Sequence, residues 1–543
     1  MRIFAGAVAL VGVIAAASPR AAGQAQPTPT PAPPLTPTPL PTPTPLPTPT
    51  PTATPTPTPP PITVSPEAAQ APIGVPQQLV VGSVFSPINA VAKDPSLVAV
   101  SIDQDTRIVT LTGLVPGTTV ITISDARGLT KDVPVTVAYQ AGTIAPLLDL
   151  RLTGDPASAD FIRDTVASVV ARAAQPRTGA QVLVGPDDVA FDGRLGEDDA
   201  ADIDTSVLIQ GEQYFSVSGT TRVHVENVAA PRISPDRLMV SDFPEVLTEN
   251  GVLFTADLRS EAPSRFLFYH YDPPAQPDRR IVLRAENDSG EPALVQFIRG
   301  IGGPSPNEME SGHDATKQFL VRTIQNEGRL ITIGANSSLN LVESDLPHGS
   351  VVCALLQLRL LSGDHIHLTL FAQNATDDPS APITQTDLLV GSQRHARGIY
   401  TVPEFHQGVE WNVDDPYLEL QIGQLPLPNS LQGEALSGDY GVLQSFVVNV
   451  ENPSAQPQDI AIYENPRGGR ATGTYLIDGV LVQSHQVPAF SRYKIRQYVV
   501  PARGFVRVTI ETIPEGGSSY PLDLVFAPDD GSVAPGAPGS PVY

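Results

Sequence analysis

Two histidines separated by one residue, His365 and His367, form the clearest metal-like pattern in the sequence, in an Asp-His-Ile-His segment at 364–367. Side chains alternate between the two faces of a strand, so both imidazoles would lie on one face, a geometry that zinc and copper sites use. A third ligand would have to come from elsewhere, with His348 or Asp364 as candidates. The alternative is a pair of histidines on the solvent face of a strand. We favour it, because a structural zinc site needs four ligands and none is spaced to help.

A second group of reactive side chains consists of His395, Glu404, His406 and Glu410. Glu404 and His406 are two residues apart, so a strand would place them on one face, where a carboxylate and an imidazole could perform acid–base catalysis in a cleft. The alternative is a polar strand edge. We favour the edge, because the spacing of a single pair carries little specificity.

Acidic residues are concentrated between positions 187 and 204, and carboxylates are the ligands that calcium prefers. The segment lacks the D-x-[DN]-x-[DN]-G spacing of a calcium loop, so we expect a solvated loop there. Its acidic residues are Asp187, Asp188, Asp192, Glu197, Asp198, Asp199, Asp202 and Asp204. Four of them remain weak metal candidates beside the histidine pair: Asp198, Asp199, Asp202 and Asp204.

Other patterns typical of catalysis or cofactor binding are absent from the sequence. It has no G-x-S-x-G elbow, no G-x-x-x-x-G-K-[ST] loop and no strand-led G-x-G-x-x-G. The single cysteine, Cys353, excludes an intrachain disulfide and lies in an apolar run where a thiol is usually inert. The single tryptophan, Trp411, and one dense aromatic cluster at 269–271 give thin support for a lectin. We therefore expect no catalytic residue, no cofactor and no enzymatic activity.

The charge balance is strongly acidic, with 33 basic against 57 acidic residues and a formal net charge of −24. Such a chain lacks the basic surface that nucleic acid or an anionic membrane attracts. The partner that we expect is instead a protein or a cell surface.

The segment 1–26 predicts a secretory signal peptide: a basic residue at Arg2, an apolar stretch that ends before Ser18, and small residues near position 25. A membrane anchor is the alternative, but the apolar stretch is shorter than the roughly 20 residues that a spanning helix needs. We expect no transmembrane segment after cleavage, and an extracytoplasmic protein that is secreted, periplasmic or on the cell surface. Residues 27–61 contain 18 Pro and 12 Thr. They predict an extended polyproline-II linker without hydrogen-bonded structure, up to about 100 Å long.

Residues 62–140 alternate apolar and polar residues in short runs separated by turns, which predicts strands. The run AKDPSLVAVSID…VTLTGLVPGTTVITISDARG…VPVTV resembles a bacterial Ig-like domain of the Big-2 type, and also the N-terminal domain of pilus-formation proteins. The resemblance is confined to positions 62–139. It implies an extracytoplasmic β-sandwich without catalytic residues.

Residues 141–230 predict a small β-α-β-β unit, in which an amphipathic helix over 157–174 starts from an Asp155 cap with Pro156 in the first turn. Such units occur in ring-building modules of secretion machinery, but also in unrelated folds. Residues 231–263 predict a connector with some strand.

A faint repeat, E-N-x-S-x-x-P, occurs at 286–292 and again at 451–457. Asn and Ser bind their own backbone in turns and Pro ends strand pairing, so the motif indicates a hairpin corner. Leu283 and Val448, which share the repeat register, should both point into a core. We infer β-sandwiches at 264–378 and 440–528, a connector or added edge at 379–439, and a disordered tail at 529–543.

The sequence as a whole predicts a mainly β, multidomain protein: Ig-like β-sandwich modules plus one small β-α-β-β unit, after a disordered Pro/Thr linker. The function we expect is a structural, adhesive or assembly role at a bacterial cell envelope or surface. A component of a pilus or secretion apparatus is the first alternative, and a secreted metal-dependent hydrolase is the least favoured.

Overall fold

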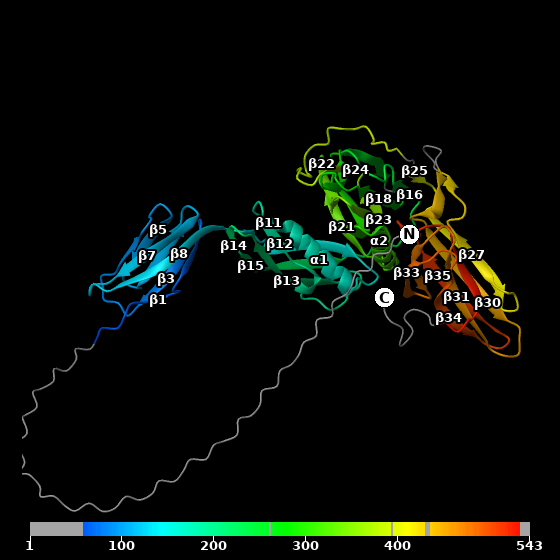
Figure 1. The fold of residues 1–543 in the computed structure, drawn as a ribbon, viewed down its shortest axis with the longest axis horizontal. Coiled ribbons are helices and arrows are strands. Elements are labelled where there is room, and N and C mark those ends of the chain that lie inside the picture. The colour runs from blue at the N-terminus through cyan, green and yellow to red at the C-terminus, as the bar shows by residue number, and fades with distance from the viewer. Residues whose placement is uncertain (1–57, 260–261, 393–394, 429–434, 533–543) are drawn as a thin grey trace, which may run out of the picture. The chain divides into compact units, whose positions relative to one another are not determined.

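The computed structural model describes residues 58–532 except 260–261, 393–394 and 429–434. The expected signal peptide at 1–26, nearly all of the linker at 27–61 and most of the tail lie outside the described residues. Residues 1–60 and 61–543 are separate units. The second unit is mostly β-structure arranged in several sheets, as the sequence predicts, and its elements are labelled in Figure 1.

The first module is a two-sheet sandwich. One sheet has the order β1-β3-β6-β5, and the other has β8, β7 and β4 in sequence, with β2 parallel to β8. Alternate residues such as Val109, Leu111, Ile121 and Ile123 are fully buried and fill the space between the sheets, as period-two strands require. The strands are β1 (Thr63–Ser65), β2 (Ala69–Pro72), β3 (Gln77–Gly82), β4 (Asn89–Ala92), β5 (Val98–Asp103), β6 (Ile108–Gly113), β7 (Gly117–Ser124) and β8 (Thr130–Gln140).

The next elements form the β-α-β-β unit. Helix α1 (Ala159–Ala173) buries an apolar face that includes Phe161, Ile162, Val166 and Val170. The strand order is β12-β13-β15-β10, with β10 and β15 parallel. The strands are β10 (Leu147–Thr153), β12 (Gln181–Leu183), β13 (Ala200–Gln210) and β15 (Val217–Asn227), accompanied by the short β9 (Gly142–Thr143), β11 (Gln175–Pro176), η1 (Pro186–Asp188) and β14 (Tyr214–Phe215). The two-residue β14 pairs with β8 and so joins this unit to the first sandwich.

The expected helix start at Asp155 is wrong. Ser158 is the N-cap, and its hydroxyl accepts a hydrogen bond from the Phe161 amide at 3.3 Å. The reason is that Ala157 forms an antiparallel bridge with Leu195: its amide donates to the Leu195 carbonyl at 2.9 Å, and its carbonyl accepts from the Leu195 amide at 3.1 Å. The helix can therefore start only after this contact.

The same sheet continues beyond residue 230. It contains ten strands in the order β12-β13-β15-β10-β21-β20-β23-β18-β16-β25, so it crosses the boundary drawn at 230/231. It takes in β16 from 231–263, expected to be a connector with some strand, and β25 from 379–439, expected to be a connector or an added edge. β10 pairs with β21 through Leu152 opposite Arg329. The additional strands are β16 (Arg237–Ser241), β18 (Ser264–Asp272), β20 (Ala293–Ser305), β21 (Gly328–Ile333), β23 (Ser350–Ser362) and β25 (Arg397–Tyr400).

This long sheet is covered on both faces in its second half. A four-stranded sheet packs against one face, and the side chains of Phe266 and Phe268 on β18 point into the core between the two sheets. Helix α2 (Glu308–Ile324) packs against the opposite face of the long sheet, and the side chains of Leu267 and Tyr269 point toward that face. The four-stranded sheet consists of β17 (Gly251–Arg259), β24 (His365–Asn374), β19 (Arg279–Asn287) and β22 (Ser337–Leu346).

Helix α2 lies in a region expected to contain only strands. Asn307 caps it by accepting a hydrogen bond from the Glu310 amide at 3.4 Å. It approaches β20 closely because Gly300 and Gly302 have no side chains: a Cβ at Gly302 would lie 2.0 Å from the Ser311 carbonyl oxygen.

The last module is a second sandwich, with sheets β26-β30-β35-β32-β33 and β27-β36-β31-β34. Its core contains Trp411, Phe446, Tyr475 and Phe526. Its strands are β26 (Glu404–Asn412), β27 (Leu418–Ile422), β30 (Leu443–Asn452), β31 (Gln458–Pro466), β32 (Ala471–Ile477), β33 (Val480–Val487), β34 (Tyr493–Val500), β35 (Gly504–Thr512) and β36 (Leu522–Pro528), with β28 (Leu427–Pro428), β29 (Ala435–Leu436) and η2 (Ser437–Asp439) before β30.

The two copies of the repeat form equivalent corners, but neither corner is the expected hairpin, because β19 and β20 lie in different sheets, and so do β30 and β31. The Asn287 side-chain amide donates to the carbonyls of residues 291, 333 and 334 at 2.8–3.1 Å. The Asn452 amide donates to those of residues 456, 500 and 501 at 2.8–3.2 Å. Leu283 and Val448 are both fully buried, so the expected core positions are confirmed, whereas each corner carries the chain from one sheet to another instead of closing a hairpin.

Candidate functional site

The structure agrees with the interpretation that we favour for His365 and His367, two histidines on the outer face of a strand. His365 and His367 lie on one half-exposed face of β24, but His365 contacts Asp288 at 2.9 Å and His367 contacts Asp257 at 2.8 Å. His348 lies apart, 2.7 Å from Asp278. Within the described ranges, these histidines do not meet with a further donor in a metal-sized group.

The acidic segment is divided among turns and ion pairs. Asp199 accepts a hydrogen bond from the Gly196 amide at 2.9 Å, and Asp198 accepts one from the Ala229 amide at 3.2 Å. Asp202 contacts His224 at 2.7 Å, and Asp204 pairs with Arg222 at 2.8 Å. The four carboxylates therefore satisfy different partners and do not converge on one point.

The acid–base group is also divided. Glu404 and His406 do share a face of β26, with a 3.5 Å contact, but Glu404 pairs with the buried Arg265 at 3.1 Å. The Glu410 carboxylate accepts a hydrogen bond from the side-chain amide of Asn449 at 2.7 Å. Cys353 is buried, as expected, and burial raises the pKa of its thiol.

His395 belongs to a different cluster, with Asp242 and Glu245. Its Nδ1 atom lies 2.8 Å from a Glu245 oxygen and 3.5 Å from an Asp242 oxygen. Burial raises the pKa of Asp242 to about 7 and also raises the pKa of Glu245. The pKa of His395 is raised, chiefly by its hydrogen bond to Asp242. The three side chains line a cavity of about 250 Å³.

Sequence reasoning singled out His395 but missed its partners. Asp242 and Glu245 lie in an ordinary Asp-Phe-Pro-Glu stretch, far earlier in the chain. The pairing of β16 with β25, which places Ser241 opposite Arg397, brings the two segments together. A long-range strand pairing of this kind leaves no local signal in the sequence.

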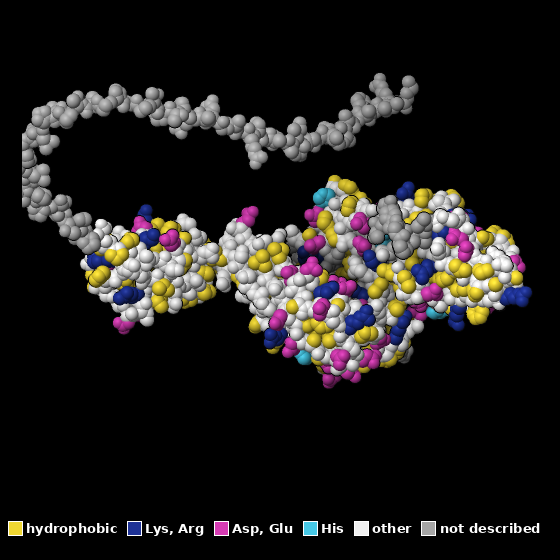
Figure 2. Space-filling view, turned by 90° about the horizontal axis from the view of Figure 1, so that it is seen from below, with side chains coloured by type: hydrophobic (Ala, Val, Ile, Leu, Met, Phe, Trp, Pro, Cys, Tyr) yellow, Lys and Arg dark blue, Asp and Glu magenta, His cyan; other side chains and the backbone are white. Residues whose placement is uncertain are grey.

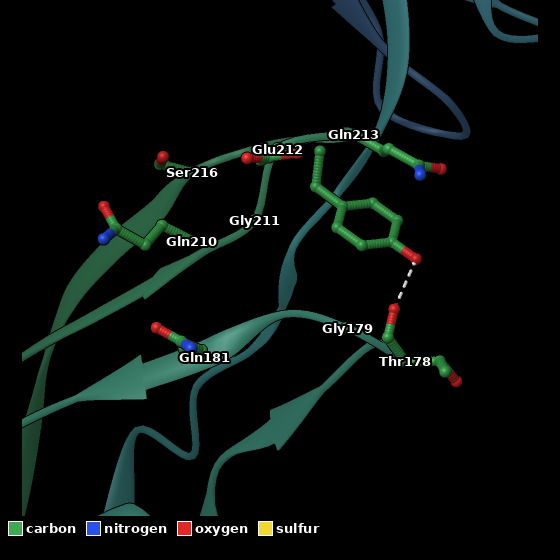
Figure 3. Close-up of a pocket in the computed structure, with 9 residues that line it drawn as sticks. Thr178, Gly179, Gln181, Gln210, Gly211, Glu212, Gln213 and Ser216 are labelled. Atoms are coloured by element: carbon green, nitrogen blue, oxygen red, sulfur yellow. Dashed lines mark hydrogen bonds between the residues drawn. The ribbon is translucent and has the colours of Figure 1, made fainter.

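A second hollow, of about 610 Å³, lies at one end of the β-α-β-β unit (Figure 3). Gln181 on β12 and Gln210 on β13 are directly paired there, and Figure 3 shows their side-chain amides on neighbouring strands. The Tyr214 hydroxyl donates to the Thr178 carbonyl at 2.9 Å and fixes the ring beside them. The remaining lining residues are Gly179, Gly211, Glu212, Gln213 and Ser216, and we name this hollow the glutamine groove.

The glutamine groove depends on a tight turn. A Cβ at Gly211 would lie 2.9 Å from the Tyr214 ring and 3.2 Å from the Ala180 backbone, so only glycine allows these turns to meet. Of the lining side chains, Glu212 alone carries a charge. The groove therefore offers amide and hydroxyl groups beside one ring, which suits a neutral ligand with many hydroxyl groups.

The outer surface reflects the acidic composition. Figure 2 shows acidic side chains (magenta) gathered over the middle of one face, with basic side chains scattered among them. No helix in the described part of the chain is long and apolar enough to cross a membrane.

Comparison with known proteins finds no matching family and no matching curated protein. Several solved structures are similar to part of the chain. A tri-modular GH5 endo-β-1,4-glucanase from Bacillus licheniformis, complexed with cellotetraose, is 10% identical with a TM-score of 0.12. The similarity covers 31% of this chain and 38% of that one.

Two further structures contain sugar-binding parts. The M60 catalytic domain with CBM51 domains from Clostridium perfringens ZmpB is 9% identical with a TM-score of 0.15, over 86% of this chain and 54% of that one. The Bacteroides ovatus mixed-linkage glucan protein SGBP-B, in complex with a heptasaccharide, is 11% identical with a TM-score of 0.11, over 54% of this chain and 71% of that one. TM-scores this low carry no argument about the activity of this chain.

Proposed function

We propose that this chain is a non-catalytic, extracytoplasmic binding protein that uses the glutamine groove to attach to a neutral, hydroxyl-rich ligand such as a surface glycan. The observation that carries the proposal is a groove lined by Gln181 and Gln210, which lie opposite each other on β12 and β13, and by the Tyr214 ring. A side-chain amide donates and accepts at once, so it can pair with neighbouring sugar hydroxyls, while an aromatic ring packs on the apolar face of a sugar.

The location at the cell envelope is part of the same proposal. It is supported by the signal-like segment 1–26, by the Pro/Thr-rich stretch that follows, and by the resemblance of residues 62–139 to bacterial Ig-like domains. The reactive side chains singled out from the sequence, including Glu404, His406 and the acidic segment, are engaged in separate contacts. This arrangement supports a binding role rather than hydrolysis.

The test is binding of the mature chain to immobilised neutral oligosaccharides of the cello, xylo and chito series. We expect at least one series to bind, and the double variant Gln181→Ala with Gln210→Ala to bind at least tenfold more weakly. The matched control, Gln407→Ala with Gln421→Ala, changes two exposed glutamines on strands of the last module and should bind like the parent.

Three outcomes would overturn the proposal. They are no binding to any series, equal binding by the groove variant, and release of reducing ends from a bound sugar. Assembly of the mature chain into closed rings in solution would instead favour the alternative of a pilus or secretion component.

A further inference from the structure

The cavity formed around Asp242, Glu245 and His395 shares no lining residue with the glutamine groove, and it is built by long-range pairing. The Asp242 amide donates to the Ala396 carbonyl at 2.9 Å, which fixes the start of the 242–250 loop beside His395. The Glu245 carbonyl accepts from the Tyr271 amide at 2.8 Å, so the loop is held at a second point. The three side chains therefore come from backbone that is anchored on the long sheet.

The donor atoms of these three residues are close enough to share one cation. One nitrogen from His395 and one oxygen each from Asp242 and Glu245 lie within 4.8 Å of one another. The Oδ1 atom of Asp242 is buried and accepts no hydrogen bond within the described structure. A buried carboxylate oxygen without a donor is costly unless a cation or a proton satisfies it.

A third carboxylate faces the same cavity. Glu308, the first residue of α2, lines it, and its negative charge contributes to raising the pKa of Glu245. The basic side chain among the residues lining the cavity is His395. Three carboxylates and one imidazole in a small cavity leave an excess of negative charge that a divalent cation would neutralise.

The cavity is closed by the last module. Gly516 and Gly517 form part of its wall, and a Cβ at Gly517 would lie 2.5 Å from the Glu308 carbonyl oxygen. A Cβ at Gly516 would lie 2.9 Å from the Tyr269 ring. The glycines let the turn after β35 reach the base of α2, so residues from β16, the segment before β25, α2 and the last sandwich surround one point.

We propose that Asp242, Glu245 and His395 bind a divalent transition metal of the zinc class, and that the carboxylate of Glu308 on the cavity wall adds to the negative charge that attracts the metal. A mixed set of imidazole and carboxylate donors suits Zn²⁺ and Mn²⁺, whereas calcium sites use oxygen ligands alone. Since the ligands come from two segments far apart in the chain, the bound metal would fasten the loop after β16 to the segment before β25.

The test uses untagged mature chain that has been treated with EDTA and dialysed. Titration calorimetry with ZnCl₂ should show one tight site, and ZnCl₂ should raise the melting temperature by several degrees. The variant Asp242→Asn with His395→Gln should bind Zn²⁺ at least a hundredfold more weakly. The matched control, Asp278→Asn with His348→Gln, removes another close His–Asp contact and should keep the site.

Circular dichroism of the site variant shows whether it folds, and Glu245→Gln provides a milder variant if it does not. Absence of stoichiometric Zn²⁺ and Mn²⁺ binding by the parent chain would overturn the proposal. So would unchanged Zn²⁺ binding by the folded site variant, or binding of CaCl₂ in preference to ZnCl₂. None of these readouts depends on a glycan.

Discussion

The imidazole Nδ1 of His313 lies 3.1 Å from both carboxylate oxygens of Glu515, and both side chains are buried where α2 meets the last sandwich. The other ring nitrogen lies 3.0 Å from the Gln483 side-chain oxygen. Thr472 and Thr474 donate their hydroxyls to Glu515 as well. Both ring nitrogens face oxygen atoms that accept hydrogen bonds. Only the protonated imidazole carries a hydrogen on each nitrogen, so the protonated form of His313 fits this position best.

This pair predicts a pH-dependent contact. Burial lowers the pKa of His313, but the hydrogen bond and the charge of Glu515 raise it more, so the pKa lies above its ordinary value. A raised histidine pKa contributes stability that is complete below the unfolded pKa, near 6.5, and is lost as the pH rises through the folded pKa. We expect the melting temperature to fall as the pH rises above about 6.5, and His313→Gln to flatten that decline. Replacing the exposed His348 by Gln should leave this decline unchanged. If the melting temperature of His313→Gln falls with pH as steeply as that of the parent, the assignment to His313 is wrong.

Glu464 predicts a second pH effect, from a buried acid without a cation. Its carboxyl oxygens have no well-aligned donor; burial outweighs the nearby Ser484 and Tyr475 hydroxyls and raises its pKa to about 8. The unfolded chain loses this proton near pH 4.5 and the folded chain only near 8, so stability falls as the pH rises between these values. Glu464→Gln, which cannot ionise, should be about 1–3 kcal/mol more stable than the parent at pH 8 and similar to it at pH 4.5. Urea unfolding at both pH values measures the difference, and a loss of stability at pH 8 would refute the prediction.

The repeated corner predicts matched losses of stability. Asn287 and Asn452 each donate to three backbone carbonyls and are almost completely buried. Truncation leaves those carbonyls without donors, so Asn287→Ala and Asn452→Ala should each cost about 2–4 kcal/mol. Asn89→Ala, at an exposed position of β4, should cost little. Urea unfolding measures all three, and a neutral result at either corner would show that its hydrogen bonds contribute little.

The close approach of α2 to β20 predicts a strong steric effect at Gly302. A Cβ there would overlap the Ser311 carbonyl, so Gly302→Ala should destabilise the protein by about 2–3 kcal/mol. Gly408 also lies in a strand, but a Cβ at that position would meet no atom within 4 Å, so Gly408→Ala serves as the control. Thermal unfolding separates the two, and equal melting temperatures would show that the helix can shift without cost.

Local patterns in the sequence predicted much of the fold. Alternating residues predicted the strands, and the turn chemistry of Asn287 and Asn452 predicted both corners, because these features depend on neighbours in the chain. Helix α2 was missed because its sequence contains Gly312 and follows two prolines; the signal that could have found it is Asn307 followed three residues later by Glu310. The ten-stranded sheet could not be predicted, since its order depends on pairings between distant strands.

The candidate sites were harder to predict from the sequence than the strands and corners. His395 was recognised as reactive, but Asp242 and Glu245 meet it only through the pairing of β16 with β25. Gln181 and Gln210 were not singled out, because exposed glutamines have no distinctive pattern until strand register places them opposite each other.

The pairing of β10 with β21 also limits how the chain can be divided. Thr153 donates its hydroxyl to the Asn326 carbonyl at 2.7 Å and accepts from the Gln296 amide at 2.9 Å, so a buried polar seam joins residues on either side of position 230. A fragment ending there would leave β10 with an open, unpaired edge, which invites association with other copies. Recombination or domain exchange at this point would therefore yield aggregating products, whereas an exchange that keeps β10 and β21 together would preserve solubility.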